Sequence, residues 1–171
     1  MKKSILATLL ASSVVLPSAA FADSLESCVA AIQSSKEGQL VKLEALTTNG
    51  KDVYSIELID GQEQEWEFTC DVATGKIIYQ EGEVESAADP KFQKMAKLDE
   101  AKAVSIAQAA FPGEVEEVEF ELKSDGHPVF EVDIESESGA ETKVEVSAVD
   151  GKILESSTEK WEIGIEEDER R

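Results

Sequence analysis

Apolar and polar residues alternate along much of the chain, in short runs that end at turn residues. Residues 117–122 and 130–135 both alternate an acidic residue with an apolar one. A period of two predicts β-strands with one buried face and one polar face. Turn dipeptides separate the predicted strands: Asn49-Gly50, Asp60-Gly61, Thr74-Gly75, Asp125-Gly126, Ser138-Gly139 and Asp150-Gly151. The pattern therefore predicts two sets of four strands.

Two other segments place their apolar residues at helical spacing. In residues 24–36, Ser24 can cap the helix, and in residues 98–111, Asp99 can do so. Pro112-Gly113 ends the second helix. Each helix precedes one set of strands and is the available cover for its apolar face.

The two halves of the chain are similar to each other: residues 46–78 align without a gap with residues 122–154. Self-similarity of this kind indicates a duplication. We therefore predict an α+β protein of two tandem repeats, each with one helix packed on one face of an antiparallel β-sheet of three to four strands. The predicted order is a signal peptide (1–22), a first domain (23–82), a linker (83–97), a second domain (98–165) and an acidic tail (166–171).

The N-terminus has the features of a secretory signal peptide: Lys2 and Lys3, an apolar run over residues 5–16, and a cleavage motif at Ala20-Phe21-Ala22. The apolar run is shorter than the roughly 20 residues that cross a bilayer. We expect cleavage after Ala22 and a periplasmic or secreted protein without a membrane span. Leu25-Glu26-Ser27-Cys28 also resembles a bacterial lipoprotein box, which leaves lipidation of Cys28 as an alternative.

Cys28 and Cys70 are the two cysteines of the chain. In an oxidising compartment an even pair favours a disulfide. Cys70 shares the phase of Trp66 and Phe68 on the apolar face of its predicted strand, so it would face the helix that carries Cys28. A metal site would require more soft ligands, and the chain has one histidine.

The chain carries 37 acidic and 16 basic residues, a formal net charge of −21. This charge repels nucleic acid and anionic lipid and attracts cationic partners. The polar face of the second set of strands is expected to project outward with Glu117, Glu119, Glu121, Glu131, Asp133, Glu135, Glu141 and Glu145. Three interpretations stay open: a solvated exterior that resists aggregation, a docking face for a basic partner, or weak binding of divalent cations.

The sequence predicts no enzyme and no cofactor. His127, the single histidine, lies between Gly126 and Pro128 in a predicted turn, where we expect an exposed residue rather than a catalytic base. No phosphate-binding loop or dinucleotide-binding motif occurs in a strand-turn-helix setting. Trp161, beside Lys160, either covers the second sheet or forms an exposed contact.

The second copy resembles the PepSY domain family through Pro112-Gly113-Glu114-Val115, residues 126–132, Val144-Glu145-Val146 and Asp150-Gly151-Lys152-Ile153. In the first copy, residues 71–77 match the last of these elements, whereas Lys36-Glu37-Gly38 lacks the proline. Together the two copies cover nearly all of the chain after residue 22.

The PepSY resemblance speaks to fold more than to function, and it transfers no catalytic or ligand-binding residue. It implies an exported, non-enzymatic protein-binding module that inhibits or regulates an exported partner such as a protease. The acidic charge of this chain favours a partner with a basic surface. The alternative is a protein that binds divalent cations or a small cationic ligand through its acidic surface. The oligomeric state is left open.

Overall fold

The computed structural model describes residues 18–165, with side chains from residue 24 onward. The first half contains α1 (Ser18–Ser35), β1 (Gly38–Thr48), β2 (Lys51–Asp60), β3 (Glu65–Asp71) and β4 (Lys76–Glu83). The second half contains α2 (Pro90–Gln93), α3 (Glu100–Ala110), β5 (Glu114–Lys123), β6 (Pro128–Glu135), β7 (Glu141–Ser147) and β8 (Ile153–Gly164). The expected signal peptide lies largely outside the described residues.

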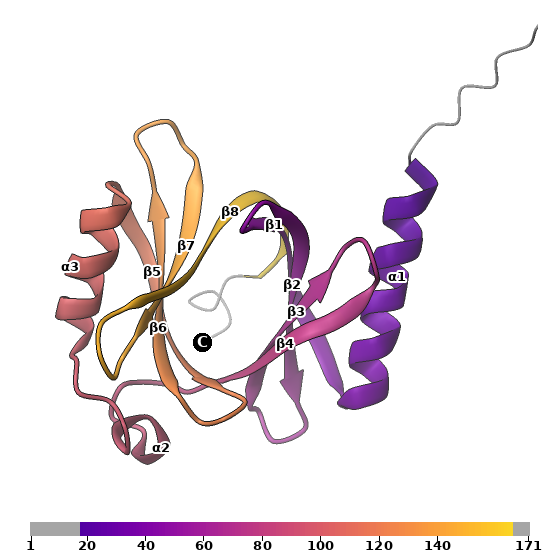
Figure 1. Cartoon of the computed structure of the whole chain (residues 1–171). Coiled ribbons are helices and arrows are strands. Elements are labelled where there is room, and N and C mark those ends of the chain that lie inside the picture. The colour runs from indigo at the N-terminus through magenta and orange to yellow at the C-terminus, as the bar shows by residue number, and fades with distance from the viewer. Residues whose placement is uncertain (1–17, 166–171) are drawn as a thin grey trace, which may run out of the picture.

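The eight strands form one closed barrel in which each strand is antiparallel to its neighbours. Two seams join the halves of the chain: β4 pairs with β5 over a short stretch that includes Glu81 and Lys123, and β8 pairs with β1 over a longer one. Figure 1 shows α1 and α3 on opposite outer sides of this barrel.

The predicted fold class, with two separate helix-on-sheet repeats, is wrong. The eight strands instead form one continuous sheet, because the edge strands of the two halves pair with each other. An unpaired edge exposes a row of backbone donors and acceptors, and closure of the barrel satisfies them.

The apolar core lies outside the barrel wall, beneath the helices. Under α1, Cys28 and Ile32 pack against Ile56, Leu58 and Phe68 on the outer face of the first four strands. The buried hydrophobic side chains of this cluster define which face of each strand is outward. The alternate residues must therefore face the barrel interior.

A second core lies under α3, where Ala103 and Ala107 allow the helix to approach the strands closely. Phe92 of α2 lies in the segment that the sequence predicts to be a linker, yet it is fully buried. Its ring makes edge-on contacts with Phe120 and Phe130 at centroid distances of 5.8 and 5.2 Å. Each half therefore has its own apolar cluster, and the barrel interior is left to other residues.

The N-terminal end of α3 is the one that the sequence predicts, whereas that of α1 is not. Asp99 caps α3 as predicted, since its carboxylate accepts a hydrogen bond from the backbone N–H of Lys102 at 2.8 Å. α1 begins at Ser18, upstream of the predicted cap Ser24. The intervening residues, Ala19 to Asp23, include three alanines, which favour helix, so nothing in this segment stops the helix before Ser24.

Two glycines in equivalent places allow close backbone approaches, one at the first residue of β1 and one directly before β5. A Cβ atom added at Gly38 would lie 2.5 Å from the carbonyl oxygen of Ile59, and one at Gly113 would lie 2.3 Å from that of Glu135. These positions require glycine for steric reasons. The shared requirement is a physical counterpart of the sequence repeat.

The Cys28–Cys70 disulfide is confirmed, and it joins α1 to β3. Both cysteines are fully buried in the cluster beneath α1. Among the described residues, no helix is long and apolar enough to cross a membrane.

Candidate functional site: the carboxylates inside the barrel

The barrel interior is lined by acidic residues that the sequence predicts to be on the surface. Glu119, Glu121, Glu131 and Asp133 have exposed fractions of only 7%, 2%, 6% and 4%. The expectation that they project outward is wrong. The pattern correctly separates an apolar from a polar face, but the barrel closes with the polar face inside.

The other four residues of the predicted acidic face are distributed between the interior and the rim. Glu117, Glu141 and Glu145 are partly buried, and Glu135 is exposed. The eight carboxylates therefore do not form a continuous outer docking face.

The first half of the chain contributes further interior carboxylates, which sequence analysis did not single out. Glu44, Glu57 and Glu81 are buried, and Glu67 is half-buried. The buried charged residues of the described chain are seven carboxylates (Glu44, Glu57, Glu81, Glu119, Glu121, Glu131 and Asp133) and two ammonium groups (Lys42 and Lys143). The interior therefore holds many more acids than bases.

Lys143 on β7 is the central cation of this interior. Its Nζ lies 2.9 Å from Glu131 Oε1, 3.0 Å from Glu44 Oε2 and 3.8 Å from Asp133 Oδ2. Burial alone would lower the pKa of Lys143, but the surrounding carboxylates, Asp133 foremost, raise it well above its usual value. The ammonium group therefore stays charged and links β7 to β6 and to β1.

Two further lysines form ion pairs closer to the ends of the barrel. Lys123 bridges Glu81 and Glu145 beside the seam between β4 and β5. Lys42 lies 3.4 Å from both Glu44 and Glu162. These pairs, together with those of Lys143, offset part of the acidic charge of the interior.

Several interior carboxyl groups favour their neutral form. Burial raises the pKa of Glu67, Glu119, Glu121 and Asp133 well above the usual range, and nearby carboxylates add to the effect. Burial also raises the pKa of Glu145 to about 8.

Glu44 differs from these acids. Burial raises its pKa, but Lys143 and Lys42 outweigh burial, and the net pKa is lowered. A carboxylate between two ammonium groups stays ionised. A buried carboxyl group without such a partner is more stable when it holds a proton or binds a cation from solution.

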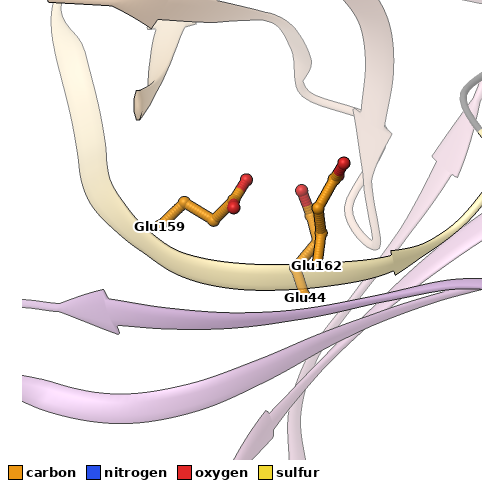
Figure 2. A group of neighbouring side chains, drawn as sticks. All are labelled: Glu44, Glu159 and Glu162. Atoms are coloured by element: carbon orange, nitrogen blue, oxygen red, sulfur yellow. The ribbon is translucent and has the colours of Figure 1, made fainter. Parts of the chain in front are cut away.

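Two groups of three carboxylates have oxygens within 4.8 Å of one another. One consists of Glu44, Glu159 and Glu162, and Figure 2 shows their side chains on the same side of the β8 ribbon. The other consists of Glu67, Glu119 and Glu131. Glu67 and Glu131 also line an interior cavity of about 10 Å³, the size of a single water molecule.

His127 and Ser147 form a pair that resembles part of a catalytic site. His127 Nε2 lies 3.0 Å from Ser147 Oγ, so the histidine is not the free, exposed turn residue that the sequence predicts. Ser147 is fully buried, and its hydroxyl also accepts hydrogen bonds from the backbone N–H groups of Val149 and Asp150. The hydroxyl shapes the turn after β7 and is inaccessible to a substrate.

An exposed apolar row lies on the outer face of β8 and continues to the residue that follows this strand. Trp161, Ile163 and Ile165 have exposed fractions of 41%, 68% and 50%. Trp161 packs at one edge on Tyr54, with ring centroids 6.3 Å apart. Of the two possibilities that the sequence leaves open for Trp161, its exposure favours a contact residue.

Comparison with known proteins gives the class of this protein. The family model for PepSY, described as "Peptidase propeptide and YPEB domain", matches residues 24–81 and 97–156. These two segments make up more than half of the chain, and the chain belongs to the PepSY family. The resemblance found in the sequence, with one match in each half, is confirmed.

One curated relative is a Bacillus subtilis (strain 168) protein with the printed name "Uncharacterized protein YkoJ". It is 28% identical over 110 residues, which cover 62% of this chain and 57% of that protein. The match thus spans little more than half the length of the relative. No solved structure matches the chain.

Proposed function

We propose that this protein is an exported, non-enzymatic binding module that inhibits or regulates an exported partner, and that a protease is the first partner to test. Membership of a family described as a peptidase propeptide domain supports this proposal. The net charge of −21 favours a partner with a basic surface.

The observation that carries the proposal is the apolar row on β8. Large apolar side chains exposed on one strand are typical of protein contact sites, and tryptophan is enriched among residues that dominate binding energy. A depression of about 200 Å³ beside Trp161 is lined by Tyr54, Val53 and Val72, among others. One apolar side chain of a partner would fit in it.

The proposed mechanism is steric occlusion. The rigid barrel wall around Trp161 covers the partner's active cleft, and the acidic surface accelerates the encounter. The formal net charge of −21 supplies the negative field that attracts a basic partner. Binding is therefore expected to weaken as salt increases.

The test is affinity capture of exported host proteins on the purified protein at low and high salt, followed by an activity assay of any captured protease. A double variant, Trp161→Ala with Ile163→Ser, removes the row. Met95→Ser is the matched control, because Met95 is similarly exposed, at 42%, away from β8. We expect a specific partner to be retained by the wild type and the control and lost with the double variant.

Two results would contradict the proposal. In one, no exported protein is retained; in the other, the double variant captures the same protein as strongly as the wild type.

The alternative function, cation binding by the acidic outer surface, requires a different site. Glu119, Glu121, Glu131 and Asp133, four of the eight carboxylates on which it depended, lie inside the barrel.

A further inference from the structure

We propose that the barrel interior is a binding site for one divalent cation that prefers oxygen ligands, with Ca²⁺ the first candidate, and that Glu67, Glu119 and Glu131 are its ligands. This inference does not depend on the proposed partner-binding function. It rests on the placement of the carboxylates, on buried polar groups without partners, and on the local balance of charge.

The geometry of the three carboxylates suits a hard cation. Their ligand oxygens lie within 4.8 Å of one another. Calcium binds oxygen at about 2.3–2.6 Å, so oxygens on opposite sides of one ion are separated by about 4.6–5.2 Å. One ion can therefore contact all three side chains with little rearrangement.

The adjoining cavity supplies space and further oxygens. It has a volume of about 10 Å³, and its lining includes Glu67, Glu131, Glu145, Thr69 and Ser157 as well as Lys143, which pairs with Glu131. A cavity of this size holds one water molecule or one ion. The hydroxyl groups are additional neutral oxygen ligands of the kind that calcium accepts.

An independent observation comes from Ser55. Its side chain is 1% exposed, and its hydroxyl has no hydrogen-bond partner among the described residues. Ser55 faces the interior and is the cross-strand neighbour of Thr69, which lines the cavity. A buried hydroxyl is nearly always hydrogen-bonded, so an unpartnered one on the inner face, next to a residue that lines the cavity, points to a water molecule or a hydrated ion in the interior.

Some interior carboxylate oxygens also lack a hydrogen-bond partner among the described residues. Asp133 Oδ1 and Glu81 Oε2 are buried and accept no hydrogen bond from the part of the chain that the structure describes. Asp133 and Glu81 have exposed fractions of 4% and 5%. These acceptors are close enough to the cluster to affect its electrostatics, and a cation with its bound water would satisfy them.

The local charge balance distinguishes this cluster from the one drawn in Figure 2. There, Lys42 lies within 3.4 Å of both Glu44 and Glu162, and Lys143 contacts Glu44 as well. Ammonium groups already supply positive charge at that position. At the second cluster, one ammonium group, that of Lys143, lies 2.9 Å from Glu131 Oε1 and is shared with Glu44 and Asp133. Within the described chain, Glu67 and Glu119 have no lysine at ion-pairing distance, so their charges are the ones that a metal ion would compensate.

The ligand set also selects the class of metal. Three carboxylates without histidine or cysteine disfavour zinc and copper, which prefer nitrogen and sulfur. Cys28 and Cys70 are joined in the disulfide and are unavailable. Calcium tolerates irregular oxygen sites, whereas magnesium requires near-octahedral geometry, so calcium is expected to bind more tightly than magnesium.

The site has a structural consequence, because its ligands come from both halves of the chain. Glu67 lies on β3, whereas Glu119 and Glu131 lie on β5 and β6. A cation held between them connects the halves across the short β4–β5 seam. Binding should therefore stabilise the closed barrel against unfolding.

The experiment is isothermal titration calorimetry of the chelator-treated protein with CaCl₂ and separately with MgCl₂, at constant ionic strength. We expect one Ca²⁺ per chain, with a dissociation constant on the order of 10⁻⁴ M, and weaker Mg²⁺ binding. Glu119→Gln and Glu131→Gln should each weaken Ca²⁺ binding by roughly tenfold or more, equivalent to ~1.4 kcal/mol. Glu135→Gln is the matched control, because Glu135 lies on the same strand as Glu131 but is exposed.

A second measurement needs no substitution in the interior, where a variant can fail to fold. Amide chemical shifts of the wild-type protein are followed by NMR during a Ca²⁺ titration. The largest changes are expected at residues 67, 119 and 131 and around Ser55. The proposal is overturned if the folded protein binds no Ca²⁺, if Glu135→Gln weakens binding as much as Glu131→Gln, or if the shifts are confined to surface acids.

Discussion

Lys143 Nζ on β7 lies 3.0 Å from Glu44 Oε2 on β1, and the two residues are 99 positions apart in the chain. β8 separates their strands in the sheet, so the contact runs through the barrel interior rather than along the wall. Both side chains are almost completely buried. One lysine thus connects the two halves of the protein and offsets part of their shared negative charge.

Replacing this lysine should therefore be costly. Lys143→Met leaves Glu44, Glu131 and Asp133 without their shared cation, and we expect the free energy of unfolding to fall by about 3–5 kcal/mol. Lys152→Met is the control: the Lys152 side chain is 75% exposed and, within the described chain, pairs only with Asp150, so its loss should change stability by less than about 0.5 kcal/mol. Urea unfolding measures both, and equal effects would contradict the central role of Lys143.

Stability should decrease as pH rises from about 5 to 8. Burial raises the folded-state pKa of Glu119, Glu121 and Asp133 and raises that of Glu145 to about 8. In this window the folded protein retains protons that the unfolded chain has lost, so raising the pH favours unfolding. Each unit by which the folded-state pKa exceeds the unfolded value corresponds to ~1.4 kcal/mol.

Carboxyl groups with lowered pKa values make the protein less stable as the pH falls, rather than as it rises. Hydrogen bonding by Lys152 lowers the pKa of Asp150 to about 2, and the lysines around Glu44 lower its pKa despite burial. Their stabilisation is lost as pH falls through those values. The urea midpoint, measured with a chelator at constant ionic strength, should therefore be highest near about pH 5. At this pH, the loss of stability from the raised pKa values and the loss from the lowered pKa values are both small. A midpoint that stays constant or increases up to pH 8 would contradict the buried placement of the acids.

The disulfide should make a large contribution through the unfolded chain. It closes a loop with a sequence separation of 42, and the chain-entropy model gives ~4 kcal/mol for its loss. Thermal unfolding with and without a reductant, compared with the Cys28→Ala, Cys70→Ala double variant, measures this contribution. If reduction leaves the melting temperature unchanged, α1 is held by packing alone.

Gly113→Ala tests the close approach between the start of β5 and the end of β6. The added Cβ would lie 2.3 Å from the carbonyl oxygen of Glu135, a backbone atom that cannot move alone, so a loss of about 1–3 kcal/mol is expected. Gly61→Ala is the control because no atom lies within 4 Å of its added Cβ. Similar urea midpoints for the two variants would show that the backbone is more widely spaced than described.

Much of the local structure follows from the sequence. Alternation over residues 117–122 and 130–135 correctly predicts strands, Asp99 correctly predicts a helix cap, and the phase of Cys70 correctly predicts its disulfide. These features depend on contacts between neighbours or on a single buried face, and residue periodicity reports both.

Closure of the barrel could not be predicted from the periodicity of the sequence. Alternation separates an apolar face from a polar one, but it does not say whether the polar face meets water or another polar face. One signal was present: Lys143 lies in phase with Glu141 and Glu145 on its strand, and Lys123 lies in phase with Glu121. A basic residue at such a position would be needed if the acids were buried together.

Carboxyl footprinting with a carbodiimide and an amine, read residue by residue by mass spectrometry, tests the buried acidic interior most directly. On the folded protein, Glu119, Glu131 and Asp133 should remain unlabelled while Glu135 reacts, and unfolding should make all four react. Equal labelling of Glu131 and Glu135 in the folded protein would contradict a barrel closed around its carboxylates.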